Sequence, residues 1–166
     1  MKAAGMLLLF LACSSAGFLA SAKLRRQAAQ MQLLTALLCD FMTYIRYQCL
    51  PLEELLNLFA AHPHYRSFRF LHRTAEGFSA AVPPSLLWQE AVAEDAAVPP
   101  QAQAILHALG TMLGTTDAEG QLASLEMYRM QMQTAADEMK EQSHKKGTLY
   151  CQLGVLAGAM LALLVL

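Results

Sequence analysis

The last third of the chain carries a helical pattern of apolar residues that passes into an uncharged run. Thr116 and Glu119 have the capping-box spacing, in which a hydroxyl and a carboxylate satisfy amide donors at a helix start. Apolar residues then recur every three or four positions: Leu122, Leu125, Tyr128, Met132, Ala135 and Met139. From Gly147 to Leu166 no residue is charged, and the run is long enough to span a bilayer, which takes about 20 apolar residues. Because no proline interrupts the stretch, we expect one long helix that ends as a transmembrane helix.

A second uncharged apolar run, Ala3 to Ala22, lies at the start of the chain. It predicts an N-terminal transmembrane helix over residues 1–22; a cleaved signal peptide is the alternative, since Ala20 to Ala22 form an A-x-A site. Basic residues follow this run directly and also precede the last one: Lys23, Arg25, Arg26, Lys140, Lys145 and Lys146. Basic residues favour the cytoplasmic side, so both clusters predict that residues 23–146 form a cytoplasmic domain and that residues 147–166 return to the membrane.

The middle of the chain has helical spacing throughout and no strand-like alternation. The first bundle helix continues from Lys23 with a buried seam: Met31, Leu34, Leu38, Phe41 and Ile45. Prolines mark the starts of further helices, which we expect over Leu52 to Ala61 after Pro51, over Tyr65 to Phe78, over Ser85 to Asp95, and from Pro100 to Leu113. Trp88 is the largest apolar anchor. The predicted fold is all-α, a bundle of about six helices between an N-terminal and a C-terminal transmembrane helix.

The composition leaves few chemical functions open. All 13 acidic residues, and all but Lys2 of the 12 Lys and Arg, lie in the middle domain. This near-neutral balance argues against nucleic-acid binding. We find no nucleophile elbow, phosphate-binding loop, dinucleotide fingerprint or CxxC pair, and so expect no catalytic residue and no cofactor. His62, His64 and His72 with Glu76 are the only residues that could be drawn as a metal site, and Pro63 breaks their spacing, so we expect no metal.

Three sets of residues are candidates for contacts or for a structural turn. Arg66, Arg69 and Arg73 share one helix face; this is either a solvated face or a surface for an acidic partner or lipid headgroups. Gly154 and Gly158 have the small-residue spacing that lets another membrane helix approach, either within the chain or in a homo-oligomer. A turn that aims the last helix at the membrane is predicted at Gly114, Thr116, Asp117 and Gln121.

Several of these residues resemble the stage III sporulation protein AB family of endospore-forming bacteria. The turn before the last helix and the terminal membrane signature are similar to that family: Leu113, Gly114, Thr115, Thr116, Asp117, Gln121, and Leu153 to Gly158. So are the first helix-to-helix turn and the tryptophan helix: Tyr47, Pro51, Leu52, Leu55, Trp88, Glu90 and Ala91. The resemblance covers essentially the whole chain. Gln48 and Leu50 depart from the glycine and threonine that the family tends to have in the first turn.

The resemblance implies a non-catalytic, two-pass membrane protein whose helical domain is similar to the cytoplasmic domains of type II secretion system protein F. It implies a place in the mother-cell membrane facing the forespore, in a secretion-like complex. The implied partners are other membrane proteins of the stage III A operon and a secretion-type ATPase. From the residues alone, a membrane-anchored sensor or ligand-binding helical bundle is the alternative, although neither end of the sequence has room for an output domain.

Overall fold

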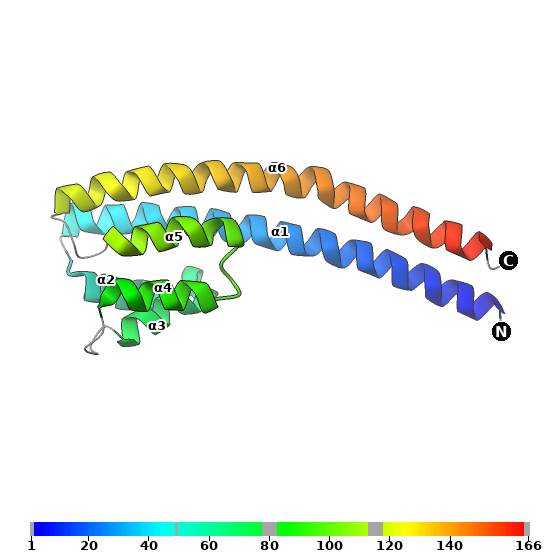
Figure 1. Cartoon of the computed structure of the whole chain (residues 1–166), viewed down its shortest axis with the longest axis horizontal. Helices are drawn as coiled ribbons and strands as arrows, with labels where there is room; N and C mark the ends of the chain where they lie inside the picture. Colours follow the sequence, from blue (N-terminus) through cyan, green and yellow to red (C-terminus); the bar gives the residue numbers. More distant parts are fainter. Residues whose placement is uncertain (1, 49, 78–82, 113–117, 165–166) are drawn as a thin grey trace. The chain divides into compact units, whose positions relative to one another are not determined.

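The computed structural model describes residues 2–48, 50–77, 83–112 and 118–164, and these form six α-helices and one 3-10 turn (Figure 1). The two long helices are α1 (Lys2–Gln48) and α6 (Ala118–Leu164). Between them come α2 (Leu52–Ala61), η1 (Pro63–Tyr65), α3 (Arg69–Gly77), α4 (Pro84–Glu94) and α5 (Pro100–Met112). No strand occurs in the described residues, so the all-α prediction is confirmed.

The chain divides into two compact units. The bundle unit comprises Gln30–Ala136, and the terminal unit comprises Met1–Ala29 together with Asp137–Leu166. The helices α1 and α6 each contribute to both units, as expected for a last helix that is continuous with the C-terminal apolar run. The division into three segments at residues 22 and 146 stays a prediction.

Trp88 lies at the centre of an aromatic core in the bundle unit. Its side chain is 1% exposed, and its indole Nε1 donates a hydrogen bond of 2.7 Å to the backbone oxygen of Leu106 on α5. The rings of Phe70 and Phe41 meet it edge to face, with ring centroids 5.1 Å and 6.5 Å away. Phe41 in turn stacks on Phe59 at 4.6 Å. The Trp88 side chain on α4 therefore contacts α1, α3 and α5. Large buried aromatic rings contribute most of the apolar area in a small core, and a buried indole N–H needs a hydrogen-bond acceptor.

The proline signals place the starts of α2 and α5 correctly and the start of α4 to within one residue. The backbone oxygen of Pro51 accepts the first hydrogen bond of α2 from the Leu55 amide, at 3.0 Å. The oxygens of Pro83 and Pro99 do the same for α4 and α5. A backbone amide at the start of a helix has no acceptor inside the helix, so proline, which has no amide hydrogen, loses no hydrogen bond there. Its fixed φ angle also suits the first turn.

The predicted start of the third helix at Tyr65 is wrong. Pro63–Tyr65 forms a 3-10 turn, in which the amide of Tyr65 bonds to the oxygen of His62, and Phe68 N bonds to the oxygen of Tyr65 at 2.9 Å. The α-helix begins only at Arg69. Phe68, Phe70, Leu71 and Ala75 are buried. Phe78 lies outside the described residues.

In the terminal unit, α1 and α6 run side by side in opposite directions (Figure 1). Ser21 is 2% exposed, and a Cβ built on Gly147 would lie 2.9 Å from its Oγ, so the glycine allows the two backbones to approach. Ser143 is also buried, and its hydroxyl donates to the oxygen of Lys140 at 2.8 Å. Small residues line the contact between these two helices.

Within the residues described, none of the helices has both the length and the apolar character required to cross a membrane.

Candidate interaction surfaces

The three predicted arginines lie on the outside of the bundle unit. Arg66, Arg69 and Arg73 are all exposed. Arg69 and Arg73 lie on α3, whereas Arg66 lies in the turn before it, so the predicted common helix face is wrong for Arg66. The Arg73 guanidinium forms a salt bridge with the Glu94 carboxylate of α4, and both side chains are more than half exposed. Within the described part of the chain, neither Arg66 nor Arg69 forms a salt bridge. The positive charge available to a partner therefore comes mainly from Arg66 and Arg69.

A shallow hollow of about 190 Å³ lies beside these arginines, between α3 and α4. It is lined by Arg69, Phe70, Arg73, Ala91, Glu94 and Asp95. Asp95 is 5% exposed, and its two carboxylate oxygens accept from the amides of Phe70 and Ala97, each at 2.9 Å. The same side chain thus caps the start of α3 and fixes the turn after α4, since amides in the first turn of a helix have no partner inside it.

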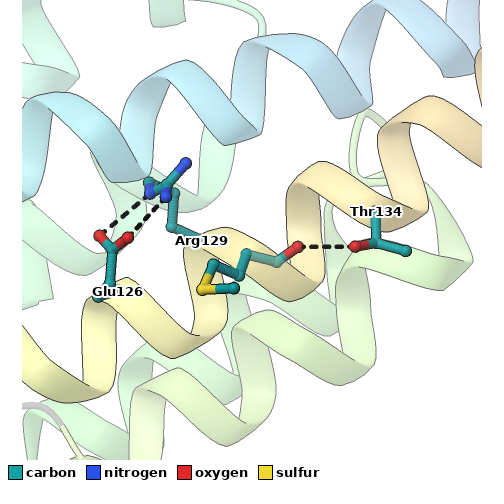
Figure 2. A network of polar contacts seen from close by, with 4 residues as sticks. Glu126, Arg129 and Thr134 are labelled. Carbon is teal, nitrogen blue, oxygen red and sulfur yellow. Dashed lines mark hydrogen bonds and ion pairs between the residues drawn. The ribbon is translucent and has the colours of Figure 1, made fainter.

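A second hollow, of about 280 Å³, lies between α1 and α6 within the bundle unit. We call it the α1–α6 groove; its lining residues are Cys39, Met42, Thr43, Arg46, Tyr47, Glu126 and Arg129. Figure 2 shows Glu126 and Arg129 on α6, with the guanidinium of Arg129 directed toward α1 and held by both carboxylate oxygens of Glu126, at 2.6 Å and 3.1 Å. Thr134, further along α6, bonds to the oxygen of Met130 at 3.1 Å.

The paired charges in the α1–α6 groove perturb each other. The hydrogen bonds from Arg129 lower the pKa of Glu126, and the bonds to Glu126 raise the pKa of Arg129. Both groups are therefore firmly charged near neutral pH. Sequence reasoning did not predict this groove; the spacing of three between Glu126 and Arg129 was its only signal.

The histidines do not gather around a common point. His62, His64 and His72 are exposed, and the Nδ1 of His62 accepts from the backbone amide of His64 at 3.3 Å. Among the described residues, no group of three His, Cys, Asp or Glu side chains could hold a metal ion. Nearby, the buried Tyr65 donates to the Asp40 carboxylate at 2.5 Å, and burial together with this bond raises the pKa of Tyr65. This pair joins η1 to α1 and is structural.

Of the residues predicted for the turn before α6 and for membrane-helix packing, some lie outside the described part of the chain. Gly114, Thr116 and Asp117 lie outside the described residues, so the turn that they predict stays a prediction. Gln121, at the start of α6, is partly buried and faces a small hollow with Ile45 and Leu125. Gly154 and Gly158 lie in α6.

The described residues form an all-α protein with two long helices and with surface hollows between α3 and α4 and between α1 and α6. The profile of one protein family, stage III sporulation protein AB (spore_III_AB), matches residues 2–166. The chain belongs to this family, and it has a role in sporulation. The family is not known as a family of enzymes. No curated protein and no solved structure matches the chain.

Proposed function

We propose that this protein is a non-catalytic membrane platform component of a secretion-like complex that joins mother cell and forespore during endospore formation. In this proposal the helices of residues 1–22 and 147–166 cross the mother-cell membrane that faces the forespore. The bundle lies on the cytoplasmic side and docks a secretion-type ATPase.

The observation that carries the proposal is the outward direction of large apolar side chains in the terminal unit. Phe18 is 66% exposed and Met160 72% exposed, although they lie on the two uncharged runs. Further exposed apolar residues on the same runs are Leu11, Leu19, Leu149, Tyr150, Leu153 and Leu156. Apolar residues on both helices would face water if the unit were solvated, whereas lipid or neighbouring membrane helices would cover them.

Neighbouring membrane proteins of the same operon are the partners proposed for this region. Gly154 and Gly158 are four residues apart on α6, which is the spacing that permits close packing of membrane helices. The contact between Ser21 and Gly147 already joins α1 to α6, at a position seven residues before Gly154. Gly154 and Gly158 are therefore proposed as the contact with a second protein or a second copy of this chain.

The surface formed by Arg66, Arg69 and Arg73, on α3 and in the turn before it, is proposed as the docking surface for the ATPase. Arg69 supplies an exposed guanidinium group at the hollow between α3 and α4, and Arg66 supplies a second in the turn before α3. Arg73 is already neutralised by Glu94. Exposed guanidinium groups recognise carboxylates through two parallel hydrogen bonds, which suits an acidic partner surface.

Reversing the two unpaired charges should weaken recruitment of the ATPase. We expect the double variant Arg66→Glu, Arg69→Glu to retain the ATPase at least about tenfold less well, the equivalent of about 1.4 kcal/mol, in co-purification of the full chain from mild detergent. The matched control, Arg46→Glu with Lys140→Glu, reverses two exposed cations elsewhere and should retain the ATPase. Equal recovery from the two variants would contradict docking on this face.

A further inference from the structure

The contact between Ser21 and Gly147 fixes the register of the two helices in the terminal unit. Both residues are buried, and a Cβ on Gly147 would lie 2.9 Å from Ser21 Oγ, so the two positions are at the same level along the helix pair. The helices run in opposite directions. Residues that follow Ser21 on α1 therefore lie on the same side of the contact as residues that precede Gly147 on α6.

This register places the basic residues of the two helices at one level. Lys23 lies two residues beyond Ser21 and Lys145 two residues before Gly147, so each is about 3 Å along the axis from the contact. Arg26 follows at about 7.5 Å. All the basic residues near this level are exposed, and we call them the basic belt: Lys23, Arg25, Arg26, Lys145 and Lys146.

Few acidic groups compensate this charge. Glu141 pairs with Lys145 at 2.5 Å, and that lysine lowers the pKa of Glu141. Lys146 donates to the neutral side chain of Gln142, at 3.2 Å. In the described residues, none of Lys23, Arg25 and Arg26 forms a salt bridge. The other acidic residues of the terminal unit, Asp137 and Glu138, lie further along α6 from the contact. The belt therefore carries a clear excess of positive charge.

On the other side of the contact, before Ser21 on α1 and after Gly147 on α6, the exposed side chains are mainly apolar. Leu19 is 67% exposed on α1, and Leu149 is 54% exposed on α6. Tyr150 is 42% exposed, an aromatic residue of the kind enriched where a membrane meets water. Neither helix has a charged residue between this level and its apolar end, other than Lys2. Cations at one level beside an uncharged apolar surface match the chemistry of a lipid headgroup layer over hydrocarbon.

We propose that the basic belt binds the phosphate groups of anionic phospholipids and so selects these lipids around the two helices. This inference rests on the membrane anchoring proposed above and adds its lipid class. Because the cations come from both helices, the register set by Ser21 and Gly147 brings them to the same headgroups. A basic side chain at the surface of an anionic leaflet contributes about fivefold to binding, so three of them together account for a large preference.

The test measures lipid preference directly on the full chain in proteoliposomes of phosphatidylcholine with a minority of phosphatidylglycerol. Electron spin resonance with spin-labelled forms of each lipid gives their relative association with the protein. We expect a preference for phosphatidylglycerol of at least about threefold, falling to near one in the variant Lys23→Gln, Arg25→Gln, Arg26→Gln. The matched control, Lys23→Arg, Arg25→Lys, Arg26→Lys, changes the same three positions without changing their charge and should keep the wild-type preference.

The outcomes separate the belt from the anchoring on which it rests. Resistance of the reconstituted chain to alkaline carbonate extraction reports the anchoring alone; extraction would overturn both proposals. A firmly inserted wild-type chain with no preference for phosphatidylglycerol would overturn the belt and leave the anchoring intact. The belt is also overturned if the belt variant keeps the preference, which is the result expected if these cations serve an acidic protein instead of lipid. It is overturned as well if the charge-preserving control loses the preference equally.

Discussion

Replacing Gly110 by alanine is expected to lower the free energy of unfolding by about 1–3 kcal/mol. The new Cβ would lie 2.4 Å from Cδ1 of Trp88, which is far closer than van der Waals contact. Trp88 cannot move aside cheaply, because it is 1% exposed, bonds to Leu106 and packs edge to face on Phe70. The clash outweighs the gain of about 0.5–1 kcal/mol that alanine brings over glycine inside a helix.

Gly77→Ala is the matched control for this prediction. There a Cβ would approach the two terminal methyl groups of Leu87 at 3.0 Å, and that flexible, half-buried side chain can yield. We expect this variant to be neutral or slightly stabilised. Urea unfolding of the full chain in mild detergent, followed by fluorescence of the single tryptophan, compares the two. Equal stability of both variants would contradict the tight packing of Gly110 on Trp88.

Replacing Asp95 by alanine is expected to cost about 2–3 kcal/mol of stability. The carboxylate accepts from the amides of Phe70 and Ala97, so its removal leaves a buried amide at the start of α3 without a partner. Hydrogen bonds to a charged acceptor are worth more than neutral ones, and the orphaned donor adds its own desolvation cost. The expected effect is a weaker α3 and a looser turn between α4 and α5.

The neighbouring variant Glu94→Ala is the control for Asp95. Glu94 is exposed and pairs with Arg73 at the surface, where such pairs contribute about 0–1 kcal/mol. The same unfolding measurement applies, with hydrogen exchange at the Phe70 amide as a local probe. Asp95→Ala should speed that exchange and Glu94→Ala should not. If the two variants were equally mild, the capping role of Asp95 would be wrong.

The elements that the sequence predicts well depend on local rules. The bounds of α2 and the starts of α4 and α5 follow from proline, whose fixed backbone acts within one turn. Most of the buried seam of α1 follows from its periodicity: Met31, Leu34, Leu38 and Phe41 are all at most 2% exposed, while Ile45 is half-buried. The start of α3 was missed because a 3-10 turn and an α-helix share the same apolar spacing over so few residues.

The parts of the candidate surfaces that could not be predicted depend on contacts between distant segments. Asp95 and Phe70 are 25 residues apart, as are Tyr65 and Asp40, and no periodic pattern connects such pairs. The exposure of Arg69 and Arg73 followed from their helix face, whereas Arg66 lies in the turn before α3. The neutralisation of Arg73 by Glu94 could not be predicted. The basic belt is an intermediate case: its residues stand out in the sequence, while their common level required the contact between Ser21 and Gly147.

The central claim is that the bundle unit lies on the cytoplasmic side of a membrane that both ends of the chain enter. Cys39 offers a direct probe, because it is a free and exposed thiol in the bundle unit. In a variant with Cys13, Cys49 and Cys151 replaced by alanine, a membrane-impermeant maleimide can react only with Cys39. We predict that intact sporulating cells leave Cys39 unlabelled and that inverted membrane vesicles from the same cells label it fully. Labelling of Cys39 in intact cells would contradict the account.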